Sequence, residues 1–148
     1  MHIMPEIGLS YLHYSGHVTA AEMSFSLSAC TDHPDFRSHF RHIADLSGLT
    51  SFENDYIGIM KVQAQAVGML KGRNTTSSCI FLTPGIVAQT FASIVARSWE
   101  GISDPVIVIL AEAEQVDSYL GLRDISVDKM RAASRPVLME GIPAIMRR

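Results

Sequence analysis

The chain has 148 residues, of which 47% are hydrophobic and 18% are charged, and this composition excludes a largely disordered protein. The length predicts a single hydrophobic core. The longest purely apolar stretch, residues 106–111, is much shorter than the ~20 residues that cross a bilayer, and the first ten residues lack the basic and apolar regions of a secretion signal. We therefore expect a cytoplasmic protein without a transmembrane segment.

Charge is unevenly distributed along the chain. Residues 1–121 have a net charge of −6, whereas residues 122–148 have a net charge of +3. The basic residues of this tail are scattered among apolar residues, so nucleic acid is not an expected partner. We predict an α/β domain over residues 1–121 and a basic, apolar docking tail over residues 122–148. The tail packs either on its own domain or on a second subunit, and we expect a homo-oligomer that forms through it.

The first third of the chain alternates strand and helix signals. Residues 6–14 have the period of a strand, which we expect to end at Gly16. Thr19 opens a capping-box spacing, and apolar residues follow it at helical intervals, which predicts a helix over residues 20–31. A second strand is predicted over residues 40–46, where a turn is expected to follow.

The strongest helix signal follows this second strand. The spacing of Thr50 and Glu53 predicts a capping box at its start, and Gly72 occupies the position of a residue that ends a helix. Apolar residues at helical intervals predict its buried face, which consists of Tyr56, Met60, Val67 and Leu70.

The remaining elements continue the alternation. Residues 77–82 predict a buried strand, after which Thr83 and Pro84 are expected to open a third helix. The predicted buried stripe of that helix consists of Val87, Phe91, Ile94, Val95 and Trp99. Residues 106–111 are β-branched and apolar, which is typical of an interior parallel strand, and a helix over residues 112–120 follows.

In the tail, Ser126 is expected to cap a short helix that ends before Pro136, and the apolar segment VLMEGIPAIM after it is expected to dock. The alternation of strands and helices along the chain predicts a mostly parallel sheet with right-handed crossovers. We therefore predict an α/β sandwich in which helices flank the sheet.

Four segments carry a family resemblance: HYSGHVT from His13, DFR from Asp35, ADLSGLT from Ala44 and AEQVDSYL from Ala113. They resemble small bacterial proteins with a STAS-like fold, the fold of the anti-anti-sigma factors, and the resemblance spans roughly residues 6–122. It implies a four- or five-stranded sheet, a regulatory role without catalysis, and recognition of a protein through the loop and helix that follow the DLSG strand. It also implies kinship in shape with CRAL-TRIO lipid-transfer domains.

One departure from the family concerns its phosphorylation switch. Anti-anti-sigma factors carry an Asp-Ser pair at the start of the helix after that strand, whereas this chain has Phe52-Glu53-Asn54-Asp55 there, without the serine. Glu53 and Asp55 either mimic a permanently phosphorylated state or favour the positive end of the helix dipole. The resemblance makes this region the candidate partner-binding face: Asp45, Ser47, Thr50, Ser51, Glu53, Asn54 and Asp55.

Other candidate sites follow from the predicted sheet, because ligands of open parallel sheets gather at the carboxyl ends of the strands. The backbone at Thr83, Gly85 and Ile86 has the position of an anion or ligand site at a helix start. Asp45 is a candidate acid or base, but no nucleophile or second carboxylate is fixed near it by the sequence. No metal site is expected, since His39 and His42 point to opposite faces of an extended strand, and no cofactor motif is present.

These observations favour a regulatory protein-interaction module that is not an enzyme. The alternative is a carrier of a small apolar ligand or lipid, which the apolar composition, the eight methionines and the CRAL-TRIO kinship favour. A hydrolase that uses Asp45 is a third hypothesis. The identity of the partner and the strand order are left open by the sequence.

Overall fold

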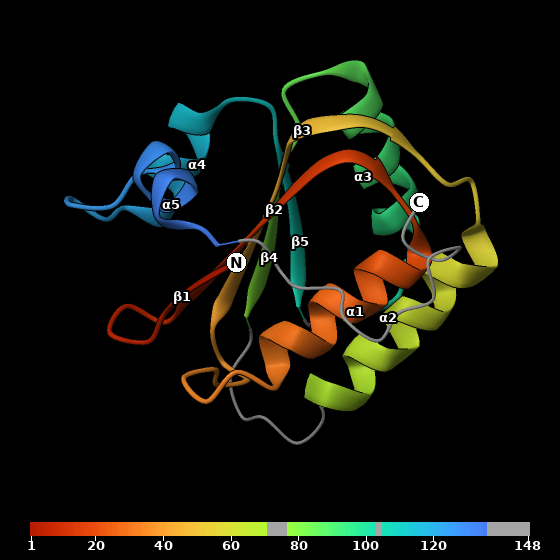
Figure 1. Cartoon of the computed structure of the whole chain (residues 1–148), viewed down its shortest axis with the longest axis horizontal. Coiled ribbons are helices and arrows are strands. Elements are labelled where there is room, and N and C mark those ends of the chain that lie inside the picture. The colour runs from red at the N-terminus through yellow and green to blue at the C-terminus, as the bar shows by residue number, and fades with distance from the viewer. Residues whose placement is uncertain (71–76, 103–104, 136–148) are drawn as a thin grey trace.

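The strands form one five-stranded sheet in the order β1-β2-β3-β4-β5 in the computed structural model, which describes residues 1–70, 77–102 and 105–135. β1 (His2–Met4) is antiparallel to β2 (Leu9–Val18). β2, β3 (Arg41–Phe52), β4 (Ser78–Leu82) and β5 (Val106–Leu110) are parallel to one another. The predicted α/β fold with a mostly parallel sheet is thus confirmed (Figure 1).

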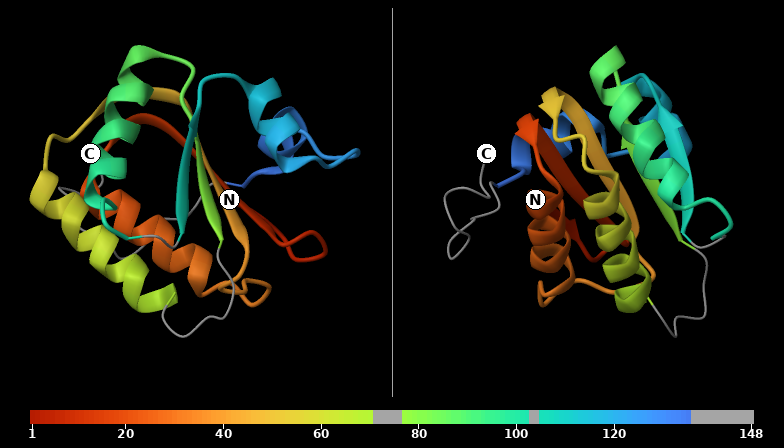
Figure 2. Two further views of the ribbon diagram at one scale, coloured as in Figure 1. Left: turned by 180° about the vertical axis from the view of Figure 1, so that it is seen from behind. Right: turned by 90° about the vertical axis from the view of Figure 1, so that its right-hand side faces the viewer.

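Helices cover both faces of this sheet. α1 (Ala20–Thr31), α2 (Tyr56–Leu70) and α3 (Ile86–Ser98) each connect two neighbouring parallel strands. Because such crossovers are right-handed and the strands follow one another in chain order, all three helices lie on one face (Figure 2). α4 (Ala113–Leu120) and α5 (Val127–Ala133) lie on the opposite face.

Three predicted helices are confirmed together with their ends. The helix over residues 20–31 is α1, and the hydroxyl of Thr19 accepts a hydrogen bond from a backbone N–H in the first turn at 3.1 Å. α4 follows a capping box at Glu112 and ends at Gly121, which has the left-handed φ of 66° that glycine adopts at little cost. Ser126 caps α5 as predicted.

β2 and β3 are longer than predicted, and their extensions pair with each other. Ser15 and Gly16 do not end the first strand, because β2 continues to Val18 through two register shifts, with Gly16 at a φ of 72°. The turn expected after residue 46 is wrong as well, since β3 continues through Gly48. A Cβ atom at Gly48 would lie 3.0 Å from that of Ser15, so this glycine permits a close, bulged strand pairing instead of a turn.

α2 begins later than predicted. The side chain of Asp55 accepts a hydrogen bond from the backbone N–H of Gly58 at 2.9 Å, so Asp55 has the capping role expected of Thr50. Thr50 and Glu53 do not form a capping box, because Thr50 still belongs to β3.

The buried face of α2 is also different from the predicted one. Its most deeply buried side chains are Ile59, Gln63 and Ala66. The residues expected there are exposed: Tyr56, Met60 and Val67. Apolar residues occur on both sides of this helix, so periodicity alone selected the wrong face. The predicted end of the helix at Gly72 and the side chain of Leu70 lie outside the described residues.

The elements after α2 need two corrections. α3 has Gly85 as its N-cap residue, and neither Thr83 nor Pro84 belongs to it. Ala88, Phe91, Ala92, Val95 and Ser98 are its buried residues, whereas Val87, Ile94 and Trp99 are only partly buried. β5 is parallel as predicted, but it is an edge strand, and Val106 and Ile109 are exposed on it.

Each face of the sheet has its own core cluster, because successive strand residues point to opposite faces. The cluster under α4 and α5 contains Met4, Leu9, Tyr11, Ile43, Ile80, Leu82, Val116, Leu120, Val127 and Met130. The cluster under α1, α2 and α3 contains Val18, Ala44, Leu46, Leu49, Ile59, Phe81, Ala88, Phe91, Ala92 and Val95.

The described part of the tail, residues 122–135, folds against its own domain. Val127 and Met130 of α5 are buried in the same cluster as residues of α4, so packing continues across the boundary expected after Gly121. Residues 136–148, which contain the apolar segment expected to dock, lie outside the described residues.

Candidate functional site

Asp45 lies inside the molecule, at the centre of a polar cluster. Its side chain is 0% exposed, which removes it from the predicted partner-binding face. The guanidinium of Arg131 in α5 donates two hydrogen bonds to Oδ2, from Nε at 3.0 Å and from Nη2 at 2.7 Å. The hydroxyl of Tyr11 donates to the same oxygen, and the backbone N–H of Ser47 donates to Oδ1 at 3.0 Å.

The hydrogen bonds of this cluster keep Asp45 charged. Burial by itself raises the pKa of its carboxyl, but the hydrogen bonds from Ser47, Tyr11 and Arg131 outweigh it and hold the pKa below its ordinary value. Burial and the neighbouring carboxylate raise the pKa of Tyr11. The carboxylate is therefore engaged by three residues and has no free path to a surface substrate, which is unfavourable for an acid or base.

The other residues of the predicted partner-binding face come from the end of β3 and the start of α2. Ser47, Thr50, Ser51, Glu53 and Asn54 are exposed, whereas Asp55 is partly buried as the cap of α2. Two of them contact the end of β2 and the first residue of α1. Ser51 Oγ is 2.8 Å from His17 Nδ1, and Glu53 accepts a hydrogen bond from the Ala20 N–H at 3.3 Å.

The structure separates the three residues of the predicted anion site. Thr83 is buried, and its hydroxyl donates to the Leu110 carbonyl at 3.3 Å, which ties β4 to the end of β5. Gly85 and Ile86 are exposed at the start of α3. Thr83 therefore holds two strands together and does not serve the helix end.

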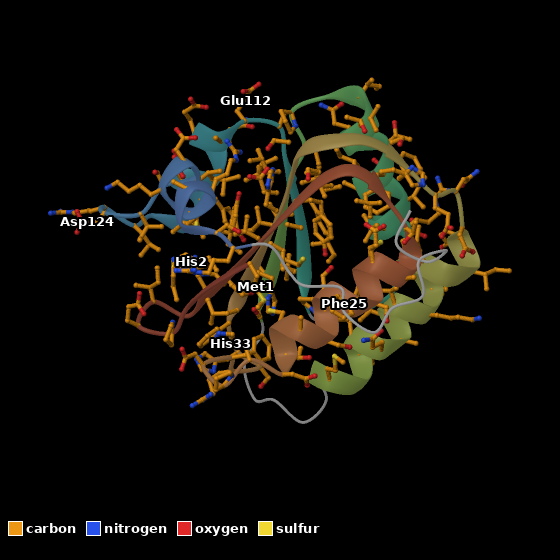
Figure 3. The ribbon with its side chains drawn as sticks, viewed as in Figure 1. Met1, His2, Phe25, His33, Glu112 and Asp124 are labelled. Atoms are coloured by element: carbon orange, nitrogen blue, oxygen red, sulfur yellow. The ribbon has the colours of Figure 1, made fainter. Side chains whose placement is uncertain are left out.

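An apolar cavity of about 140 Å³ lies between the sheet and the layer of α1, α2 and α3. The label of Phe25 marks α1, one of the helices of this layer, in Figure 3. Leu12, Leu27, Ala44, Ile59, Phe81 and Phe91 are among its lining residues. Thr31, Met69 and Trp99 also line it, so the cavity reaches the amino ends of the strands, whereas ligand positions were expected at their carboxyl ends.

Both cysteines line this cavity. Burial raises the pKa of the Cys79 thiol to about 12, and it also raises the pKa of Cys30. Both thiols are therefore neutral near pH 7 and line the cavity as small, weakly polar groups.

The histidines considered for a metal site have other contacts. His42 Nδ1 hydrogen-bonds with Ser10 Oγ, and its ring stacks on Phe36 with centroids 5.6 Å apart. The ring of His39 packs edge-on against Phe40. Within residues 1–70, 77–102 and 105–135, no three His, Cys, Asp or Glu side chains are grouped as metal ligands.

Sequence reasoning identified neither the cavity nor the role of Arg131. The cavity depends on small side chains at inward positions of facing elements, among them Ala44, Ala66 and Cys79. Their sizes are visible in the sequence, but the predicted face of α2 was the wrong one. Arg131 is 86 residues from Asp45 in the chain, and only the fold brings the two together.

Comparison with known proteins finds no matching family model, no matching curated protein and no matching solved structure. The STAS-like resemblance therefore stays a prediction. In the part of the chain that the structure describes, none of the helices has the length and apolar character needed to cross a membrane.

Proposed function

We propose that this protein is a non-catalytic binding protein whose cavity holds a small, largely apolar molecule. The cavity of about 140 Å³ carries this inference, because protein interiors are otherwise packed as densely as organic crystals. This cavity is partly open to its surroundings, so a small molecule can enter it and displace solvent from an apolar lining.

The size of the cavity limits the ligand. A dry, engineered protein cavity of about 150 Å³ binds benzene, so a single ring or a short branched chain fits the volume here. The binding interpretation agrees with the apolar composition, and with the CRAL-TRIO kinship that the STAS-like resemblance implies. Catalysis is disfavoured because Asp45 is engaged by Arg131 and the two cavity thiols are neutral.

Ligand-induced stabilisation tests this proposal. We expect benzene, toluene or indole at millimolar concentration to raise the unfolding temperature of the whole chain, because a ligand that binds only the folded state stabilises it. Ala66→Leu, which places three more carbons in the cavity, is expected to abolish the shift. Ala64→Leu is the matched control, since Ala64 is exposed on the same helix. If none of the three compounds shifts the wild-type transition, the cavity is not a binding site.

A second candidate function, protein contact, is favoured by the outer side of α2. Tyr56, Ile57, Met60 and Val67 form an exposed apolar stripe along this helix, and Ile57 is 71% exposed. Lys61 is the one charged residue of α2. Two copies of a chain with net charge −3 can therefore meet along this stripe without opposing carboxylates. We propose a second copy of this chain as its occupant.

Sedimentation velocity separates this contact from self-association through the tail. A dimer is expected for the wild type, and a monomer for the double variant Ile57→Lys with Met60→Lys. Ile86→Lys is the control, because Ile86 is equally exposed at the start of α3, away from α2. Removal of residues 136–148 leaves the dimer intact if α2 is the interface. A monomeric wild type, or a dimer lost only on that truncation, excludes the α2 contact.

A further inference from the structure

Gln63 is a buried polar residue in the mostly apolar lining of the cavity. It lies in the middle of α2 and is only 9% exposed. Its side-chain amide makes no hydrogen bond to any residue within the described part of the chain. Its amide atoms are not fully enclosed, since Glu22 Oε1 is the one side-chain N or O atom of the described residues that is enclosed and lacks a partner. The amide of Gln63 therefore keeps accessible surface and is available to a molecule that enters the cavity.

The neighbouring glutamine shows what the same side chain does when it is part of the helix packing. Gln65, two residues further along α2, is less buried than Gln63. Its Oε1 accepts a hydrogen bond from Ser24 Oγ at 2.7 Å, and its Nε2 donates to Ser28 Oγ at 2.9 Å. Gln65 thus joins α2 to α1, whereas Gln63 lines the cavity and its two donors and its acceptor are not used by the described protein atoms.

The other polar side chains that line the cavity include three that are already bonded to protein atoms. Ser10 is bonded to His42, Thr31 donates to the Leu27 carbonyl at 3.0 Å, and Ser98 donates to the carbonyl of Val95. Each of these bonds lies within one layer of the fold and needs no ligand. The unused capacity for hydrogen bonding that Gln63 adds is therefore not a general property of the lining.

The lining also indicates the charge of a ligand. None of the described lining residues is an Asp, Glu, Lys or Arg. A charged ligand would lose its hydration in this cavity without gaining an opposite charge, which is far more costly than burial of a neutral polar group.

Building on the proposed binding function, we propose that the cavity takes a neutral molecule with an apolar body of about one ring and a single hydroxyl or carbonyl group, which hydrogen-bonds with the side-chain amide of Gln63. The apolar lining binds the body of the ligand. Gln63 fixes its orientation and discriminates it from a pure hydrocarbon of the same size, because a site with an unpaired amide disfavours a ligand that leaves the amide unpaired.

Phenol and toluene are a matched pair for this test, since they differ by a hydroxyl in place of a methyl group. Their dissociation constants for the whole chain can be measured by ligand-observed NMR titration. We expect both to bind the wild type. The affinity for phenol relative to that for toluene should be at least fivefold lower in Gln63→Leu than in the wild type. This is the factor that the loss of one neutral hydrogen bond of about 1 kcal/mol produces.

Two further variants control the comparison. Gln63→Met keeps the length of the side chain, removes the amide and is expected to give the same change in preference as Gln63→Leu. Gln65→Met makes the same substitution where the amide bonds to α1, and it should leave the phenol-to-toluene ratio unchanged.

The possible outcomes separate the two proposals. If toluene binds but phenol does not, or if the ratio is the same in the wild type and both Gln63 variants, the role of Gln63 is wrong and the proposed binding function stands. If neither compound binds, the binding function fails and the ligand class fails with it.

Discussion

The two faces of the sheet are packed differently, although they share the same strands. Under α4 and α5, large side chains such as Leu9, Ile80 and Val116 are 0% exposed, and Arg131 of α5 is bonded to Asp45. Under α1, α2 and α3, a cavity interrupts the packing of the helices on the strands beside the core cluster of that face. The comparison shows that close packing on one face of a sheet does not require equally close packing on the other face.

The largest effect is expected from removing the positive charge of Arg131, on the sheet face that α4 and α5 cover. Arg131→Met leaves the buried carboxylate of Asp45 without its charged partner, and the loss of one partner of a buried pair costs about 3 kcal/mol of unfolding free energy. Urea denaturation measures this difference. Asp128→Asn is the control, because it removes an exposed ion pair in which the carboxylate of Asp128 lies 3.6 Å from the guanidinium of Arg131. Its unfolding free energy is expected to change by less than about 0.5 kcal/mol. Equal effects of both variants would show that the unfolding free energy does not depend on the bond between Arg131 and Asp45.

A smaller effect on the unfolding free energy is expected when the carboxylate of Asp45 is protonated at low pH. Because the folded pKa of Asp45 is below its unfolded value, the unfolded state binds more protons between the two values. The contribution of Asp45 is therefore fully present above the unfolded pKa and is lost as the pH falls through the folded pKa. Unfolding free energies measured between pH 6 and pH 2 should fall more steeply for the wild type than for Asp45→Asn. Parallel curves would contradict the assigned pKa direction.

Filling the cavity is expected to stabilise the packing on the sheet face that α1, α2 and α3 cover. Ala66→Leu adds three carbons to the lining and should raise the unfolding free energy by about 1–2 kcal/mol, since each apolar carbon that is buried contributes up to ~0.8 kcal/mol. Ala92→Leu makes the same change in a part of this face where Ala92 is 0% exposed and does not line the cavity. Overpacking there should cost about 1–3 kcal/mol. Thermal unfolding of both variants checks the two signs, and destabilisation by both would mean that the cavity has no room for added side chains.

The smallest effect concerns how firmly α1 and α2 fit together. A Cβ atom at Gly58 would clash with the carboxylate of Asp55, which caps α2, and would lie 2.7 Å from the Cβ of Ala20 in α1. We therefore expect Gly58→Ala to destabilise the protein by about 1 kcal/mol or more, despite its better helix propensity. At Gly68 a Cβ atom would meet nothing within 4 Å, and Gly68→Ala should stabilise by up to about 1 kcal/mol. A neutral Gly58→Ala would show that the cap at Asp55 and the contact with Ala20 both adjust at little cost.

Local signals in the sequence predicted much of the fold. The caps at Thr19 and Ser126 set helix starts correctly, because a capping side chain acts within one turn of its own backbone. The mostly parallel sheet followed from the order of elements. β1 was missed because His2–Met4 is too short to show a period, and the extension of β3 was missed because Gly48 suggests a turn unless its partner Ser15 is known.

The candidate site was much less predictable. Asp45 was selected as an exposed strand-end group, and the structure instead makes it the buried partner of Arg131, at a distance in the chain that no local pattern covers. Gln63 was not selected, because the predicted buried face of α2 did not include it. Which face of a helix is buried depends on the neighbouring helices, and their positions are a property of the whole fold.

The bond between α5 and β3 also has a consequence for the order of assembly during synthesis. The parallel strands are neighbours in chain order, so each can pair with the preceding one as it leaves the ribosome. Arg131, by contrast, emerges after all five strands. The bond between Arg131 and Asp45 can therefore form only after the whole sheet has been synthesised.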